Sequence, residues 1–185
     1  MAHASADMPY FINPSVNYEQ SKKIEAYGHA MTELLALLEG ESDLIVIMSS
    51  INCILKTHFN YYYWVGFYIS DGQKLKVGPY QGTLGCLDIS IGRGVCGRVA
   101  ATGKTIIVDD VHALDQGKDH IACDPNSQSE IVVPVMNSVG NLIAVFDVDS
   151  SVKGSFDVID QQYLEQIMSV FFTDRKHSTN LINHL

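Results

Sequence analysis

Apolar residues in the first third of the chain recur at the spacing of helices. Over residues 18–38 they form one stripe, which ends at Gly40, so a helix is expected there. A second helix is expected from Ser42, as its N-cap, to about residue 59. Cys53 falls on the apolar face of this second helix, which predicts a buried, unreactive thiol.

The spacing then changes to that of strands. Residues 61–70 are aromatic and β-branched and lead into an Asp71-Gly72 turn, which predicts a hairpin strand. Alternation along it places Tyr62, Trp64 and Tyr68 on one face. A Gly-rich stretch follows, in which LDISI predicts a short strand and residues 94–102 predict a short helix that ends at Gly103.

The second half predicts further strands and a closing helix. TIIVDDV is expected to form a strand, and a long loop leads to IVVPVMN and NLIAVFDVD, which predict a hairpin around residues 138–140. FDVIDQQYLEQIMSVFFTDRK predicts an amphipathic helix. This order predicts an α+β fold, with a central antiparallel sheet flanked by N- and C-terminal helices. We expect one domain over residues 17–174, a loosely ordered extension over residues 1–16 and a tail over residues 175–185.

Composition and charge exclude several classes of partner. The chain has 185 residues, 46% of them hydrophobic, and a formal net charge of −9 without a basic cluster, which argues against nucleic acid. No apolar run is long enough to cross a membrane and no secretory signal is visible, so a cytoplasmic location is expected. In that compartment the four cysteines are expected to be mainly reduced, with any disulfide transient and catalytic.

Two cysteines are candidates for chemistry from their local sequence. Cys123 lies in HIACDPNSQS, a polar loop that leads into a strand beginning at Glu130. Cys96 lies in the first turn of the predicted short helix, where the helix dipole, Arg93 and Arg98 would lower its thiol pKa. The alternative, that Cys96 packs inward, has about equal support from the spacing.

Three carboxylates are expected to converge on one face of the second hairpin. Alternation puts Asp147 and Asp149 beside Ile143 and Val145, and Glu130 starts the partner strand. Carboxyl groups crowded into a partly apolar site should have raised pKa values, so one could donate a proton while the others hold an ammonium group. The alternative is an exposed acidic strand end.

A metal or nucleotide site is disfavoured. His112 and His120, together with Cys86, Cys96 and Cys123, could be taken for zinc ligands, but the chain has no CxxC pair and the spacings fit no usual structural site. GRGVCGR does not follow the order of a dinucleotide fingerprint. We therefore predict no bound metal and no bound cofactor.

The combination of elements and motifs resembles the GAF domains and, among them, the free methionine-(R)-sulfoxide reductases. The likeness is carried by GCLDISIGRGVCGRVAATGKTIIVDDV, HIACDPNSQSEIVVPV and LIAVFDVDS, and it extends from about residue 18 to residue 172. The resemblance implies an L-methionine (R)-S-oxide reductase. It also implies a compact cytosolic homodimer that is regenerated by thioredoxin and, indirectly, by NADPH.

The resemblance also implies roles for individual residues. Cys123 would be the nucleophile, Cys86 the principal resolving thiol and Cys96 a second resolving or relay thiol, although local electrostatics favours Cys96 as the thiolate. The implied substrate-binding residues are Trp64, Tyr68, Glu130, Asp147, Asp149 and, through backbone N–H groups near Gly94–Gly97, Val95. The three carboxyl groups would also supply the proton. Two rival interpretations are a non-catalytic GAF sensor of a small molecule or of redox state, and a structural zinc protein.

Overall fold

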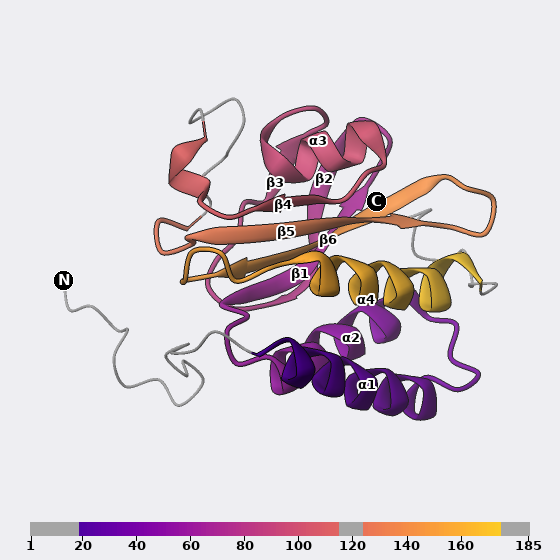
Figure 1. Cartoon of the computed structure of the whole chain (residues 1–185). Helices are drawn as coiled ribbons and strands as arrows, with labels where there is room; N and C mark the ends of the chain where they lie inside the picture. Colours follow the sequence, from indigo (N-terminus) through magenta and orange to yellow (C-terminus); the bar gives the residue numbers. More distant parts are fainter. Residues whose placement is uncertain (1–18, 115–123, 175–185) are drawn as a thin grey trace.

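A six-stranded antiparallel sheet forms the centre of the computed structural model, which describes residues 19–114 and 124–174 (Figure 1). The strand order is β3-β2-β1-β6-β5-β4. The strands are β1 (Trp64–Ser70), β2 (Lys74–Gln81), β3 (Asp88–Ser90), β4 (Ile106–Val108), β5 (Ser129–Met136) and β6 (Leu142–Ser150). The helices are α1 (Gln20–Leu37), α2 (Leu44–His58), α3 (Gly94–Thr102) and α4 (Val158–Met168), with a 3-10 turn at Val111–Ala113 and a π turn at Ser169–Thr173. The predicted α+β class is confirmed.

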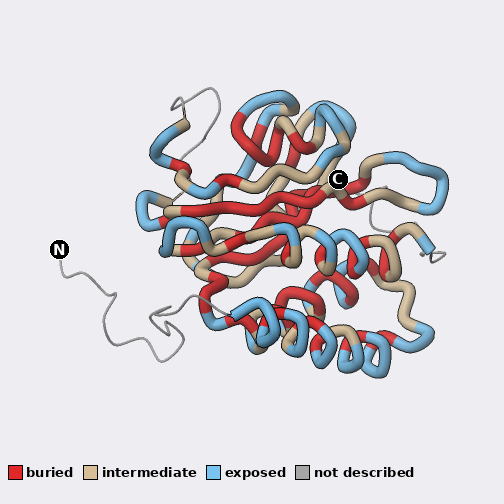
Figure 2. Tube along the Cα trace, viewed as in Figure 1, coloured by how far each residue is buried: buried red, intermediate tan, exposed pale blue. Residues whose placement is uncertain are grey.

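The helices divide unequally between the two faces of the sheet. Helices α1, α2 and α4 lie on one face, and α3 lies on the other (Figure 1). Each face buries its own apolar cluster, and the larger cluster fills the space between the sheet and the three helices (Figure 2). The smaller cluster, under α3, includes Trp64, Tyr68 and Cys96. The sheet therefore separates the main core from the face that carries most of the candidate chemistry.

Helix α2 begins and packs differently from the expectation. Its N-cap is Asp43, not Ser42, because the Asp43 carboxylate accepts hydrogen bonds from the N–H groups of Ile45 and Val46. The prediction of a buried Cys53 was wrong, since this thiol is exposed. The residues that α2 buries are Leu44, Ile47, Met48, Ile51, Asn52 and Leu55, and this stripe leaves position 53 on the outside.

The first strand is shorter than its sequence pattern indicates. It begins at Trp64, and Tyr62 packs in the main core under the helices, so placing Tyr62 on the same face as Trp64 and Tyr68 was wrong. The strand alternation starts only after residue 63, which explains the difference. Helix α3 has the predicted bounds and ends at Gly103, whose φ of 64° is the left-handed conformation that favours glycine.

The predicted hairpin of β5 and β6 is confirmed and sets the register of the acidic residues. Glu130 lies opposite Asp149, and Val132 lies opposite Asp147. On the other side of β6, Asp149 pairs with Trp64 and Asp147 with Gly66. These pairs bring the three carboxyl groups and the aromatic residues of β1 onto one face of three neighbouring strands. Ile143 does not share that face; it joins the main core.

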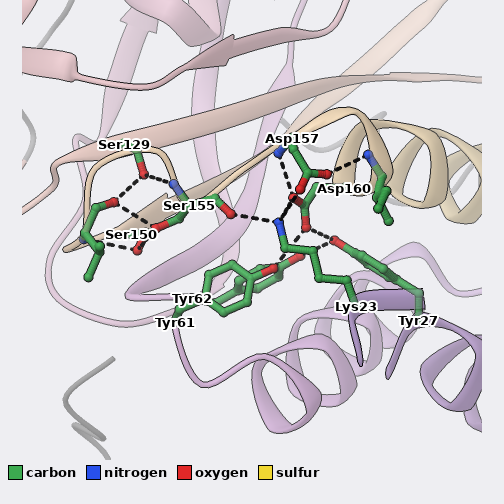
Figure 3. Close-up of polar contacts among 11 residues, drawn as sticks. Lys23, Tyr27, Tyr61, Tyr62, Ser129, Ser150, Ser155, Asp157 and Asp160 are labelled. Carbon is green, nitrogen blue, oxygen red and sulfur yellow. Dashed lines mark hydrogen bonds and ion pairs between the residues drawn. The ribbon is translucent and has the colours of Figure 1, made fainter. Parts of the chain in front are cut away.

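A buried network of hydrogen bonds and an ion pair connects α1 to the start of α4 (Figure 3). The Asp160 carboxylate accepts hydrogen bonds from Tyr27 at 2.8 Å and Tyr61 at 2.9 Å, and Lys23 Nζ lies 2.5 Å from its other oxygen. The Tyr62 hydroxyl joins the network through Tyr27, at 2.7 Å. Asp160 is fully buried, so its charge depends on these partners.

Replacement of Asp160 by alanine is therefore expected to destabilise the fold strongly. The change removes the buried carboxylate that accepts from Tyr27 and Tyr61 and leaves Lys23 with the half-exposed Asp157, at 3.1 Å, as its carboxylate partner, at a cost of about 3–5 kcal/mol. Chemical denaturation of the variant should show this loss, whereas Asp88→Ala, which removes an exposed partner of Lys74 and Lys76, should change stability little. Equal losses in the two variants would contradict this account of the network.

Candidate active site

A pocket opens on the α3 face of the sheet. It encloses about 500 Å³, part of it open to solvent. The lining residues are Trp64, Tyr68, Leu84, Gly85, Ile89, Gly94, Val95, Cys96, Asp124, Ser127, Glu130, Asp147 and Asp149. Seven of the predicted site residues thus meet in one cavity: the three carboxylates, the two aromatic residues, Val95 and Cys96.

The three carboxyl groups form the floor of the pocket. Glu130 and Asp147 are buried, with exposed fractions of 5% and 6%, and Asp149 is half-buried. Burial raises the pKa of Glu130 and of Asp147, and repulsion from neighbouring carboxylates adds to both shifts. Burial also raises the pKa of Asp149 to about 7, against a hydrogen bond from Ser127 that lowers it. The expectation of raised pKa values is confirmed. The alternative, an exposed acidic strand end, is wrong, because Glu130 and Asp147 are buried.

Asp147 Oδ1 is buried and has no hydrogen-bond partner among the described residues. An unsatisfied buried acceptor is costly, and it is typical of a site built for a ligand that donates hydrogen bonds. The pocket floor therefore combines proton-holding carboxyl groups with an acceptor that a bound ammonium group could satisfy.

Cys96 packs inward, and its thiol is not activated. Its exposed fraction is 4%, and Sγ donates a hydrogen bond to Asp147 Oδ2 at 3.3 Å. Burial raises the pKa of this thiol, and the carboxylates of Asp147 and Glu130 raise it further. The expectation that Arg93, Arg98 and the helix dipole would lower the pKa was wrong, because burial and neighbouring carboxylates outweigh them. The inward-packing alternative is confirmed.

Trp64 and Tyr68 form one wall of the pocket. Their rings stack with centroids 5.6 Å apart, and Tyr80 stacks on the other side of Trp64 at 5.3 Å. The backbone approaches this wall closely. A Cβ atom at Gly85 would lie 2.9 Å from the Tyr68 hydroxyl oxygen. A side chain there would push the loop away from the aromatic rings.

The first turn of α3 also lines the pocket, through Gly94, Val95 and Cys96. Backbone N–H groups in the first turn of a helix lack intrahelical acceptors and favour anions. The helix is held tightly against β3, since a Cβ at Gly97 would lie 2.3 Å from the Ser90 carbonyl oxygen. The backbone N–H groups of this turn are therefore suited to a carboxylate, whereas the floor is suited to an ammonium group.

The cysteines of the chain differ in state. Cys86 is disulfide-bonded, whereas Cys53 and Cys96 carry free thiols. Cys86 lies in the loop after β2, half-buried against the smaller apolar cluster. Cys123 and His120 lie outside the described residues, so the roles predicted for them stay predictions.

Sequence reasoning missed Asp124 and Ser127 as pocket residues. They were assigned to turn chemistry, and Asp124 does accept a hydrogen bond from the N–H of Asn126 at 2.8 Å, as in such a turn. Both also line the pocket. Their place between Cys123 and Glu130 in the sequence is the signal that could have identified them.

One group of metal-ligand side chains gathers in the described part of the chain. Single donor atoms of Cys96, Glu130 and Asp147 lie within 4.8 Å of one another. The group contains no histidine, and His112 instead lies 3.1 Å from the side-chain nitrogen of Gln128. The zinc set that combined histidines with cysteines therefore has no support among these residues, and the absence of a metal stays a prediction.

Comparison with known proteins gives the family. The GAF domain matches residues 55–171. Free methionine-R-sulfoxide reductase of Escherichia coli is 36% identical over 147 residues, which cover 80% of this chain and 87% of the relative. The chain belongs to the GAF-domain family of free methionine-R-sulfoxide reductases.

Solved structures agree with this membership. Free methionine-R-sulfoxide reductase from Neisseria meningitidis, in complex with its substrate, has 36% identity and a TM-score of 0.76 over 85% of this chain and 92% of that one. The fRMsr of Staphylococcus aureus, also in complex with substrate, has 38% identity and a TM-score of 0.71, with coverages of 78% and 92%. This member of the reductase family forms a single GAF domain.

The acidic floor should give the reductase a recognisable pH dependence of stability. Asp149 has its pKa raised from 3.8 to about 7, so the folded chain holds a proton there that the unfolded chain releases between about pH 4 and pH 7. The stability that this group contributes is complete below about pH 4 and is lost as the pH rises through about 7.

Asp149→Asn removes this titration, so its Tm relative to that of the wild type should increase between pH 5 and pH 8. Thermal unfolding of both proteins in matched buffers measures the difference. Parallel curves for the two proteins would show that Asp149 does not hold the proton.

Proposed function

We propose that this protein reduces free L-methionine (R)-S-oxide to L-methionine in the pocket on the α3 face. The observation that carries the proposal is the joint presence of proton-holding carboxyl groups and an aromatic wall in one pocket, which is also lined by Gly85, the residue before Cys86. Membership of the reductase family supports it, since relatives at 36% and 38% identity have been solved in complex with their substrate.

The substrate orientation follows from the polarity of the cavity. The α-ammonium group would bind the acidic floor, where Asp147 Oδ1 is without a partner. The α-carboxylate would bind the N–H groups at the start of α3, near Val95. The S-methyl end would lie against Trp64 and Tyr68. A methionine residue within a polypeptide has neither terminal charge, so the floor and the start of α3 favour the free amino acid.

The chemistry requires a proton and a sulfur nucleophile. A carboxyl group kept protonated by its raised pKa gives its proton to the sulfoxide oxygen, which makes the sulfur electrophilic. Cys123 takes the oxygen as a sulfenic acid, so that its sulfur is oxidised by two electrons and the sulfoxide is reduced to the thioether of methionine. Among the carboxyl groups, Glu130 and Asp149 face each other across β5 and β6 and are the proposed acids.

Regeneration proceeds through an intramolecular disulfide. The Cys86 thiol attacks the sulfenic sulfur, water leaves, and a thioredoxin-type dithiol reopens the disulfide by exchange. Two observations support Cys86 over Cys96 as the first resolving thiol: Cys86 is disulfide-bonded, and Cys96 is buried with a raised pKa. Leu84 and Leu87, exposed by 81% and 74%, flank Cys86 and offer an apolar contact to a protein reductant.

We further propose that the protein is a homodimer in the cytoplasm. A reducing cytoplasm would supply thioredoxin and, through its reductase, NADPH. A homodimer would bury apolar residues exposed on α1 and the start of α2, such as Ile24, Leu35, Leu37 and Val46. In the described part of the chain, no helix has the length and apolar character to cross a membrane.

Product analysis with defined substrates tests the proposal. The reduced protein should release methionine from free L-methionine (R)-S-oxide, but release little from the S epimer or from the N-acetylated, C-amidated (R) compound. Thioredoxin, thioredoxin reductase and NADPH should sustain turnover. If no methionine appears even with dithiothreitol, while the free amino acid raises the Tm, the chain is a GAF sensor and not a reductase.

A further inference from the structure

Asp124 joins the loop that carries Cys86 to the chain that follows Cys123. Its Oδ2 accepts hydrogen bonds from the Tyr63 hydroxyl at 3.0 Å and from Thr83 Oγ1 at 2.5 Å. Its Oδ1 accepts from the N–H of Asn126 at 2.8 Å. We refer to Asp124, Tyr63 and Thr83 as the Asp124 clasp.

The clasp brings together three segments that are far apart in the sequence. Tyr63 directly precedes β1, and Thr83 lies three residues before Cys86. Asp124 directly follows Cys123, and consecutive Cα atoms are about 3.8 Å apart across a trans peptide bond. Fixing Thr83 to Asp124 therefore limits how far apart the two cysteines can be.

The clasp is also fastened to the pocket walls. Trp64 Nε1–H donates to the Thr83 carbonyl oxygen at 3.1 Å, and the Tyr63 N–H donates to the Asp149 carbonyl oxygen at 2.7 Å. Ser127, three residues after Asp124, donates a hydrogen bond to the Asp149 carboxylate. The segment after Cys123 is thus bound to the pocket walls at two points, Asp124 and Ser127.

The hydrogen bonds of the clasp are charge-assisted at neutral pH. Partial burial raises the pKa of Asp124, but the hydrogen bonds from Thr83, Asn126 and Tyr63 outweigh it and lower the pKa below the usual value. Donors to an ionised carboxylate form stronger hydrogen bonds than donors to a neutral acceptor. A surface turn forms without hydroxyl donors from distant segments, so the two hydroxyl groups that donate to Asp124 indicate a role beyond the turn.

We propose that the Asp124 clasp positions Cys86 and Cys123 for the resolving step, by holding the two loops together through Tyr63 and Thr83. The inference rests on the proposed function for the identity of that step. The Cys86 sulfur forms a bond to the Cys123 sulfur, and the sulfenic hydroxyl leaves as water with the proton of the Cys86 thiol. Proximity fixed in advance raises the rate and the equilibrium constant of such a closure.

Tyr63 and Thr83 separate the clasp from substrate binding, because neither lines the pocket, whereas Asp124 does. Thr83→Val removes the hydrogen bond from Thr83 Oγ1 to Asp124, and Tyr63→Phe removes the one from the Tyr63 hydroxyl to Asp124 together with the longer one that this hydroxyl accepts from Asn126 Nδ2 at 3.4 Å. Both changes nearly keep the side-chain volume. Thr32→Val is the matched control, because Thr32 Oγ1 donates only within α1, to the Gly28 carbonyl oxygen, on an exposed surface. Thermal unfolding of each variant shows whether the fold is retained.

A redox equilibrium tests the clasp without using the reductase activity. The full-length protein is equilibrated with reduced and oxidised glutathione, and the fraction with the Cys86–Cys123 disulfide is measured by alkylation and peptide mapping. We expect the effective concentration of the cysteine pair to fall about tenfold in Thr83→Val and further in the double variant with Tyr63→Phe. Thr32→Val should match the wild type.

A single-turnover experiment then assigns the effect to the resolving step. With one equivalent of free methionine sulfoxide, Thr83→Val should release methionine at the wild-type rate but form the disulfide about tenfold more slowly. Dimedone, which captures sulfenic acids, should label Cys123 in this variant more than in the wild type. A merely structural role for Thr83 would slow both steps or neither.

The two proposals fail in different ways. Wild-type effective concentrations and wild-type disulfide rates in Thr83→Val and in the double variant would overturn the clasp, whatever the substrate. A clear effect in glutathione, together with no methionine released by the wild type, would overturn the reductase and leave the clasp as a feature of a redox-responsive disulfide.

Discussion

Replacing Cys123 with serine is expected to abolish turnover, with a loss of at least about a thousandfold. A serine hydroxyl cannot take the sulfoxide oxygen as a sulfenic acid, so no methionine should form even in a single turnover. Cys96→Ser should lose far less, because the Cys96 thiol is buried with a raised pKa and already donates a hydrogen bond to Asp147. Cys53→Ser, on the exposed side of α2, is the matched control and should match the wild type.

The measurement is methionine released per protein from one equivalent of free methionine sulfoxide, without a recycling system. This assay isolates the first chemical step from disulfide formation and from the reductant. The assignment would be reversed if Cys123→Ser released one equivalent while Cys96→Ser released none.

Glu130→Gln and Asp149→Asn should each lower kcat/KM by about 10²–10⁴-fold, the usual contribution of a positioned acid. Both side chains keep their shape and lose the proton that the sulfoxide oxygen needs. Since neither change introduces a buried charge, both variants should fold, and their Tm at pH 8 should be no lower than that of the wild type. Asp88→Asn, on the exposed end of β3, is the control.

The pH dependence of kcat/KM in the wild type shows whether the carboxyl group must be protonated for the reaction. The acid must be protonated, and its pKa is raised to about 7 at Asp149 and well above its usual value at Glu130. The kcat/KM should therefore hold at lower pH and fall as the pH rises through the pKa of the coupled carboxyl groups. A rate that rises steadily with pH would instead indicate that thiolate formation limits the reaction.

The sequence predicted the parts of the site that depend on strand alternation. From Ser129 to Val135 and from Ala144 to Ser150 the two strands pair without a register shift, so the common face of Asp147 and Asp149 follows from a period of two. Ile143 lies at the register shift, and the alternation predicted its face wrongly. Helix α3 was also predictable, because Gly103 provides the left-handed residue that ends it. These are local properties of consecutive residues.

The properties that the sequence did not predict are those that depend on tertiary contacts. The pKa of Cys96 is raised by burial and by carboxylates 34 to 53 positions away in the sequence, which no local pattern reveals. The sequence around Asp124 is typical of an ordinary turn, and the hydrogen bonds of Asp124 to Tyr63 and Thr83 form only when the sheet is folded. The exposure of Cys53 depends on which side of α2 packs against the sheet.

The division of the molecule by its sheet has a consequence for assembly. The pocket opens on the side of α3, whereas the apolar residues left exposed on α1 lie on the opposite side (Figure 1). Two copies that associate back to back through their helical layers would leave both cavities accessible to small molecules and to a reductant. Each subunit would then work independently, and joining subunits by fusion at this layer would not obstruct either entrance.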